Sequence, residues 1–434
     1  GDGCGLLMKT PAQFLRAVAG EEGFDLNKQF AVGMVFLNPH ETMAGRCRSE
    51  LEKQLNAVGL ATLGWRKVPV DPSVCGEEAL RTLPIIEQIF VNAPDGMARA
   101  LFNRQLFIAR RRTERVLADI DPSFYVASLC ANTLSYKGMV MPSVLAKFYR
   151  DLEDPRMQSA VCVFHQRFST NTWPQWRLAQ PFRLLAHNGE INTIQGNRNW
   201  ARARAKNFQS DKLPDVSGLQ PLVSMDGSDS SSLDNLLEVM LAGGMDVLQA
   251  MRLLVPPAWQ ADERLDPDIR AFYEFFGCHI EPWDGPAGVV MTDGRYAACT
   301  LDRNGLRPAR YVLTDDRHLT IASEIGVYDY APESVIEKGR LGPGEMLAVD
   351  LQDGKLLNTS AIHDQIKARA PYRRWLKKGI RYLESELIDV RMAAEPMDPD
   401  TIAVYQKMFN LSAEERNEVL RVLAEAGMEA VGSM

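Results

Sequence analysis

Short apolar runs alternate with stretches of helical periodicity along this chain of 434 residues. Runs rich in β-branched, aromatic and small apolar residues, bounded by polar turns, are typical of strands. The predicted strands are 30–37, 124–129, 160–164, 287–291, 296–301, 311–313 and 319–322. Asp293-Gly294 separates two of them, which is typical of a tight hairpin.

Helical periodicity lies between these batches of strands. The range 97–120 places apolar residues such as Leu101 and Leu106 on one stripe. The range 233–254 has similar spacing, although the double glycine at 243–244 weakens it. Because strands come in separate batches instead of alternating with helices, the pattern predicts a layered α+β architecture.

The range 371–434 has a different pattern. Charged residues multiply there, and 402–409 and 413–426 are predicted to be helical, with Gly427 at the position of a helix C-cap. We therefore predict one domain over 1–370, followed by a helical linker and the beginning of a further domain.

Charge and composition argue against nucleic acid and membranes as partners of this chain. The formal net charge of -7 gives no electrostatic reason to expect nucleic acid. The basic run Arg110-Arg111-Arg112 lies in a predicted helix, where it forms either a solvated face or pairs with acidic neighbours. No apolar stretch is long enough to span a bilayer, and no signal peptide is recognisable. We expect no membrane partner and a cytoplasmic location.

The seven cysteines are scattered, and none forms a Cys-x-x-Cys pair. This pattern argues against a disulfide framework and against a zinc site. The six histidines are equally dispersed. We therefore expect no metal site in this chain.

Three segments combine residues suited to holding an amino acid. Arg167 follows a predicted strand and offers a planar fork for a carboxylate. Asn188 and Gly189 offer an amide and a backbone N–H that could stabilise an oxyanion. Asp229, which precedes a predicted helix, could hold an ammonium group.

Each segment also has an ordinary structural interpretation. Arg167 could be a surface or ion-pair residue, and Asn188-Gly189 could be only a turn. The cluster that contains Ser232 and Asp234 could serve only to cap the helix. Taken together and in this order, the three segments favour a site for an amino acid more strongly than any one of them alone.

That order, Arg-x-x-Thr, His-Asn-Gly and then Ser-Asp, resembles class II glutamine amidotransferases. These are N-terminal-nucleophile hydrolases with a four-layer αββα sandwich. Longer stretches are similar to the large subunits of bacterial glutamate synthases. They are HQRFSTN at 165–171, QPFRLLAHNGEIN at 180–192, GNRNWARAR at 196–204, LVPPAW at 254–259, EPWDGPAG at 281–288 and LDRNGLRPARY at 301–311.

The resemblance implies a site for glutamine. Arg167 would bind the α-carboxylate, with Phe168 and Thr170 beside it, and Asp229 would hold the α-ammonium group. The pair Asn188-Gly189 would form the oxyanion hole. In this family the histidine at the position of His187 is not the general base, so a packing or orienting role is expected. The loop 302–308 is expected to be a structural loop that borders the site, although its two arginines could equally form buried ion pairs.

The family nucleophile is an N-terminal cysteine whose own amino group serves as the base. The resemblance implies that this chain begins downstream of it. Cys4 would have to be exposed by trimming three residues, which is the less favoured alternative. Cys162 lies in an apolar strand, where burial is expected to raise the thiol pKa. We therefore expect the 434-residue chain alone not to hydrolyse glutamine.

The resemblance further implies that the complete subunit makes glutamate from glutamine and 2-oxoglutarate. Ammonia would pass to a reductive site with FMN and an iron–sulfur cluster beyond residue 434, so this chain should bind no cofactor. Its implied partners are glutamine, the remaining synthase domains and a small electron-donating NADPH-dependent subunit. The alternatives are another class II amidotransferase and a non-catalytic glutamine-binding module.

Overall fold

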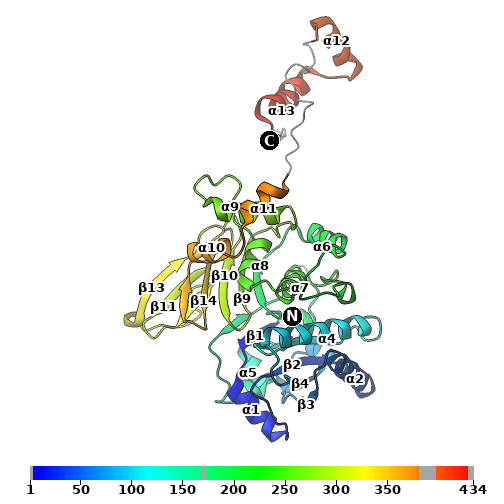
Figure 1. Cartoon of the computed structure of the whole chain (residues 1–434), viewed down its shortest axis with the longest axis vertical. Coiled ribbons are helices and arrows are strands. Elements are labelled where there is room, and N and C mark those ends of the chain that lie inside the picture. Colours follow the sequence, from blue (N-terminus) through cyan, green and yellow to red (C-terminus); the bar gives the residue numbers. More distant parts are fainter. Residues whose placement is uncertain (1–2, 169–171, 381–396, 429–434) are drawn as a thin grey trace. The chain divides into compact units, whose positions relative to one another are not determined.

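A computed structural model describes residues 3–168, 172–380 and 397–428. Figure 1 shows the course of the chain. By its internal contacts the chain divides into two compact units, Gly1–Lys377 and Lys378–Met434. No helix in the described ranges is long and apolar enough to cross a membrane.

The first unit contains strands and helices in mixed order. Its strands are β1 (Cys4–Lys9), β2 (Phe30–Leu37), β3 (Thr62–Lys67), β4 (Ile85–Asn92), β5 (Tyr125–Cys130), β6 (Thr133–Gly138), β7 (Cys162–His165), β8 (Leu185–Gly189), β9 (Ala287–Thr292), β10 (Tyr296–Leu301), β11 (Arg310–Thr314), β12 (Leu319–Ala322), β13 (Val335–Arg340), β14 (Met346–Asp350) and β15 (Lys355–Leu357). Its helices are α1 (Ala12–Glu21), α2 (Glu41–Ala57), α3 (Glu77–Arg81), α4 (Arg99–Leu117), α5 (Leu145–Phe148), α6 (Ile194–Arg204), α7 (Asp229–Ala242), α8 (Val247–Leu254), α9 (Pro267–Gly277) and α10 (Thr359–Lys367), with α11 (Tyr372–Gly379) at its end.

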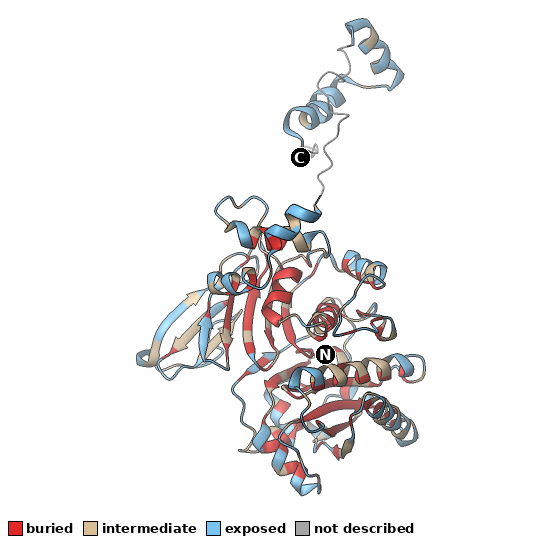
Figure 2. Cartoon of the chain, in the orientation of Figure 1, coloured by how far each residue is buried: buried red, intermediate tan, exposed pale blue. Residues whose placement is uncertain are grey.

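Two sheets pack face to face in the middle of this unit. One has the order β15-β14-β10-β9-β8, and the other has the order β6-β1-β7. Leu7, Val163 and Ala186 share a buried cluster between them, against which Val290 packs. The neighbouring Val289 belongs instead to the core under α7, α8 and α9, because successive strand residues point to opposite faces. Figure 2 shows how fully these strands are buried.

A further sheet has the order β3-β4-β2-β5. Every residue of β2 is buried, because the strand has a core on each face. Val35 packs in the cluster formed with α2 and α4, whereas Met34 packs in the cluster that includes β1 and β6. This double burial explains why the sequence of β2 is continuously apolar. A smaller sheet, β12-β11-β13, is partly exposed.

The expected α+β class, with facing sheets and helices outside them, is confirmed. The predicted strands 30–37, 296–301 and 319–322 form with those bounds. The single helix predicted over 233–254 is wrong. Gly244 has a φ of +106°, which ends α7, and Asp246 then caps α8 by accepting a hydrogen bond from the Gln249 N–H (3.0 Å).

The second unit contains α12 (Pro399–Met408), a π-helix η8 (Glu415–Leu420) and α13 (Arg421–Ala426). Gly427 adopts a left-handed conformation at the end of α13, as predicted for a C-cap. Within the first unit, the Tyr372 ring at the start of α11 lies 5.3 Å from that of Phe272. The division of the chain at residue 370 stays a prediction.

Candidate functional site

Along the outer edge of β8, the outward-pointing backbone N–H groups before Gly189 each have a side-chain acceptor. β8 is the last strand of its sheet, so every second residue directs its backbone N–H away from β9. The Leu185 N–H donates to Asp234 Oδ1 (3.3 Å), and the Gln180 side chain bonds both the N–H (2.8 Å) and the C=O (3.1 Å) of His187. The N–H of Gly189 points the same way but meets no acceptor among the described residues.

Gly189 occupies a position that no other residue fits. Its φ is +130°, and a Cβ there would lie 1.8 Å from the Pro286 carbonyl oxygen. That oxygen also accepts the Glu190 N–H (3.0 Å), which holds the end of β8 against the segment before β9. The glycine therefore permits a close backbone approach and leaves an edge donor at the end of β8.

The side chain of Asn188 is held by Arg307 and Ser323, neither of which was predicted to be a site residue. Its Oδ1 accepts a hydrogen bond from an Arg307 guanidinium nitrogen (2.5 Å). Its Nδ2 donates to Ser323 Oγ (3.1 Å), which leaves the second amide hydrogen for another acceptor. Arg307 lies in the loop expected to border the site, whereas nothing in the local sequence pointed to Ser323.

Asp229 connects the start of α7 to the end of β8. Its Oδ2 accepts the Ile191 N–H (2.9 Å) and lies 3.9 Å from His187 Nδ1. The N-cap of α7 is Ser228, which accepts the Ser231 N–H (3.1 Å). The capping interpretation of this segment therefore holds for Ser228, and the Asp229 carboxylate is directed toward the His-Asn-Gly strand.

His187 is buried between these groups. Burial lowers its pKa, and Arg307 lowers it further, although the charge of Asp229 acts in the opposite direction. Neither ring nitrogen has a hydrogen-bond partner among the described residues. The packing or orienting role expected of His187 stays a prediction.

The residues after β7 lie beside β8 and β1. The Arg167 N–H donates to His165 Nδ1 (3.1 Å), while the Arg167 side chain is exposed. Burial lowers the pKa of His165, and the adjacent His187 lowers it further. Phe168 covers Gly3, where an added Cβ would lie 2.3 Å from the ring. Thr170 falls outside the described residues.

The thiols of β1 and β7 have different surroundings. Cys4 is buried in the core that includes α1 and α5. Cys162 is exposed, so its expected burial in an apolar strand is wrong. Successive side chains of β7 point to opposite faces, so Cys162 and Phe164 lie on an exposed face and Val163 on a buried one. The surrounding protein still desolvates the thiolate and raises the Cys162 pKa to about 11. The described residues contain no cluster of His, Cys, Asp and Glu that could hold a metal ion.

The turn before β8 is held by a carboxylate from inside α7. Asp234 is fully buried, and its two oxygens accept the N–H groups of Arg183 (3.2 Å) and Leu184 (2.8 Å) in addition to that of Leu185. The interpretation of Asp234 as a helix cap is therefore wrong, because it caps a neighbouring turn instead. Burial, together with the charge of Glu238, raises the pKa of Asp234.

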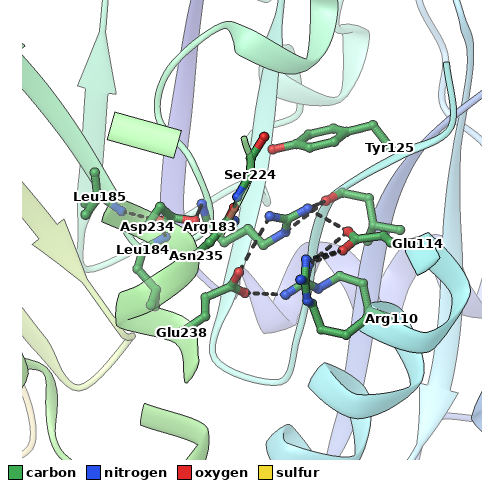
Figure 3. Close-up of polar contacts among 12 residues, drawn as sticks. Arg110, Glu114, Tyr125, Arg183, Leu184, Leu185, Ser224, Asp234, Asn235 and Glu238 are labelled. Atoms are coloured by element: carbon green, nitrogen blue, oxygen red, sulfur yellow. Dashed lines mark hydrogen bonds and ion pairs between the residues drawn. The ribbon is translucent and has the colours of Figure 1, made fainter. Parts of the chain in front are cut away.

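A buried ion-pair network extends from this turn to α4 (Figure 3). Arg183 donates to Glu114 (2.9 Å) and to the Val126 carbonyl (2.7 Å). Arg110, from the basic run, is 1% exposed and bonds both Glu114 (2.8 Å) and Glu238 (2.7 Å). Of the two interpretations of that run, pairing with acidic neighbours is confirmed for Arg110. The network joins α4 and α7 to the turn that leads into β8.

The strand-edge N–H of Gly189 and the fixed amide of Asn188 thus place two donors next to each other at the end of β8. Residues 1–375 match the family model of the class II glutamine amidotransferases. Because this match covers most of the chain, the chain belongs to the class II glutamine amidotransferases.

The curated proteins similar to this chain include glutamate synthases. It is 38% identical over 443 aligned positions to the glutamate synthase (NADPH) large chain of Bacillus subtilis (strain 168), covering 100% of this chain and 28% of that one. It is 39% identical to the large chain of the same name from Azospirillum brasilense, covering 100% of this chain and 29% of that one. The chain thus spans less than a third of these relatives.

Among solved structures, the glutamine phosphoribosylpyrophosphate amidotransferase from B. subtilis aligns at 14% identity with a TM-score of 0.33. The alignment covers 76% of this chain and 49% of that one.

Proposed function

We propose that this site binds glutamine and stabilises the oxyanion that forms when the complete polypeptide hydrolyses the side-chain amide. The observation that carries the proposal is the pair of donors at the end of β8. The Gly189 N–H lacks a described acceptor, and the adjacent Asn188 amide has a hydrogen to spare. Two such donors are what a tetrahedral oxyanion requires.

The remaining roles follow from charge. In the proposal, Asp229 holds the α-ammonium group of glutamine, since its carboxylate lies beside the His-Asn-Gly strand. Arg167 holds the α-carboxylate with its exposed guanidinium group, with Phe168 and Thr170 next to it. Cys4 and Cys162 supply no nucleophile, because one thiol is buried and the other has a pKa near 11.

For the complete polypeptide we propose glutamate synthesis from glutamine and 2-oxoglutarate. The similarity to glutamate synthase large chains over the whole length of this chain supports the proposal. FMN and iron–sulfur chemistry would then reside in other domains of the same polypeptide. Electrons would come from a separate NADPH-dependent subunit. A non-catalytic glutamine-binding role is the alternative that the following experiment distinguishes.

The test is the Asn188→Ala substitution in the complete polypeptide. Loss of one oxyanion donor should lower the kcat for ammonia release by roughly 10²–10³-fold with little change in KM. Asn199→Ala, on the exposed face of α6, is the matched control and should keep the wild-type rate. If Asn188→Ala has a normal kcat per folded molecule, Asn188 is only a turn residue and does not stabilise the oxyanion. Glutamine binding without any ammonia release by the wild type would favour the non-catalytic module.

A further inference from the structure

Arg307 lies beside Asn188 and packs against a glycine of the neighbouring strand. Gly288 lies directly opposite Asn188 on the neighbouring strand β9. A Cβ on Gly288 would lie 3.7 Å from the Arg307 Cβ, which is an ordinary contact, so the arginine stem packs next to this glycine. From there the guanidinium group reaches Asn188 Oδ1 at 2.5 Å, across 119 residues of sequence.

This contact determines which end of the amide is the donor. A primary amide can rotate by half a turn, which exchanges its oxygen and its NH₂ group. With Arg307 beside it, the rotated amide would place NH₂ against a guanidinium group, which only donates. Ser323 Oγ accepts from Nδ2, but a hydroxyl can also donate, so the preference for this orientation comes from Arg307. Arg307 therefore keeps a donor where the proposed oxyanion hole needs one.

The charge of Arg307 is not used in an ion pair with any described carboxylate. Arg303, from the same loop, differs because it pairs with Asp284. The Nε of Arg307 is buried and has no hydrogen-bond partner among the described residues. A cation that donates to Oδ1 draws electron density from the amide, which makes the Nδ2–H a stronger donor.

We propose that Arg307 is a positioning residue for glutamine hydrolysis, which orients and polarises the Asn188 amide without touching the substrate. This inference rests on the proposed function, in which Asn188 stabilises the oxyanion. It assigns to the loop after β10 a role in the rate of the chemical step rather than in substrate affinity.

The experiment measures ammonia release by the complete polypeptide carrying Arg307→Met, Arg307→Lys or Arg303→Met. Arg307→Met should lower kcat by roughly 10–100-fold, less than loss of the donor itself, with KM within about twofold of wild type. Arg307→Lys retains the positive charge and a donor group, so its kcat should be at least about threefold higher than that of Arg307→Met. Arg303→Met should keep the wild-type kcat.

A double substitution separates action through Asn188 from any independent effect. In an Asn188→Ala background, Arg307→Met should change kcat by less than about twofold, because the group it acts on is gone. If the double substitution lowers kcat by the product of the two single effects, the inference is wrong. It is also wrong if the kcat of Arg307→Lys is no higher than that of Arg307→Met. A normal kcat in Arg307→Met when Asn188→Ala is impaired would overturn it too. If Asn188→Ala itself is unimpaired, the oxyanion role of Asn188 is wrong, and this inference fails with it. A wild type that binds glutamine without releasing ammonia would overturn the proposed function instead.

Discussion

Replacing Gly189 with alanine should damage both the stability and the site of this protein. At a φ of +130° an alanine is strained, which costs on the order of 1–3 kcal/mol. The added Cβ would also lie 1.8 Å from the Pro286 oxygen, so the backbones must separate by more than about 1 Å. That shift breaks the Glu190–Pro286 hydrogen bond, which adds about 1 kcal/mol. The free energy of unfolding should therefore fall by about 2–4 kcal/mol.

Urea unfolding of Gly189→Ala and Gly288→Ala, followed by circular dichroism, measures this difference. Gly288 lies on the adjacent strand, has no positive φ, and a Cβ there would make only ordinary contacts of 3.6 Å or more. Gly288→Ala should therefore unfold within about 1 kcal/mol of wild type. The kcat of Gly189→Ala should also fall, because the strained backbone moves the edge N–H. Equal stability of the two variants would refute the argument from the Pro286 contact.

Three further predictions concern other parts of the molecule. Arg167→Lys should weaken glutamine binding by about 1.5–3 kcal/mol in isothermal titration, and equal affinity would return Arg167 to a surface role. Burial raises the pKa of Glu114, but Arg110, Arg183 and Arg111 outweigh it and lower the pKa to about 2. The stabilisation this gives is present above pH ~4.5 and is lost as the pH falls toward 2, by up to about 3 kcal/mol. Urea unfolding should show this loss in the wild type and not in Glu114→Gln, and identical pH profiles would contradict the assignment. Cys162→Ser should keep the wild-type kcat for ammonia release within about twofold, because a thiol with a pKa near 11 carries little thiolate at neutral pH. A larger loss would show that Cys162 takes part in the reaction.

Much of the framework could be predicted from local sequence. β2 and β10 form where predicted, because burial imposes apolar runs whose length and composition are visible without the fold. The strand β8 was missed, since Leu-Ala-His-Asn-Gly is short and partly polar. It forms a strand because β9 pairs with it and because Gln180 and Asp234 satisfy its outer edge.

The candidate site divides in the same way. The sequence by itself determined the family, and it singled out Asn188, Gly189 and Asp229, because the spacing of these motifs is local and specific. The tertiary structure decided what holds them. Arg307 and Ser323 lie 119 and 135 residues from Asn188 in the sequence, and their contacts with its amide exist only after the sheets have packed. No local pattern records such a contact, because hydrogen bonds between distant segments depend on where the fold places their backbones.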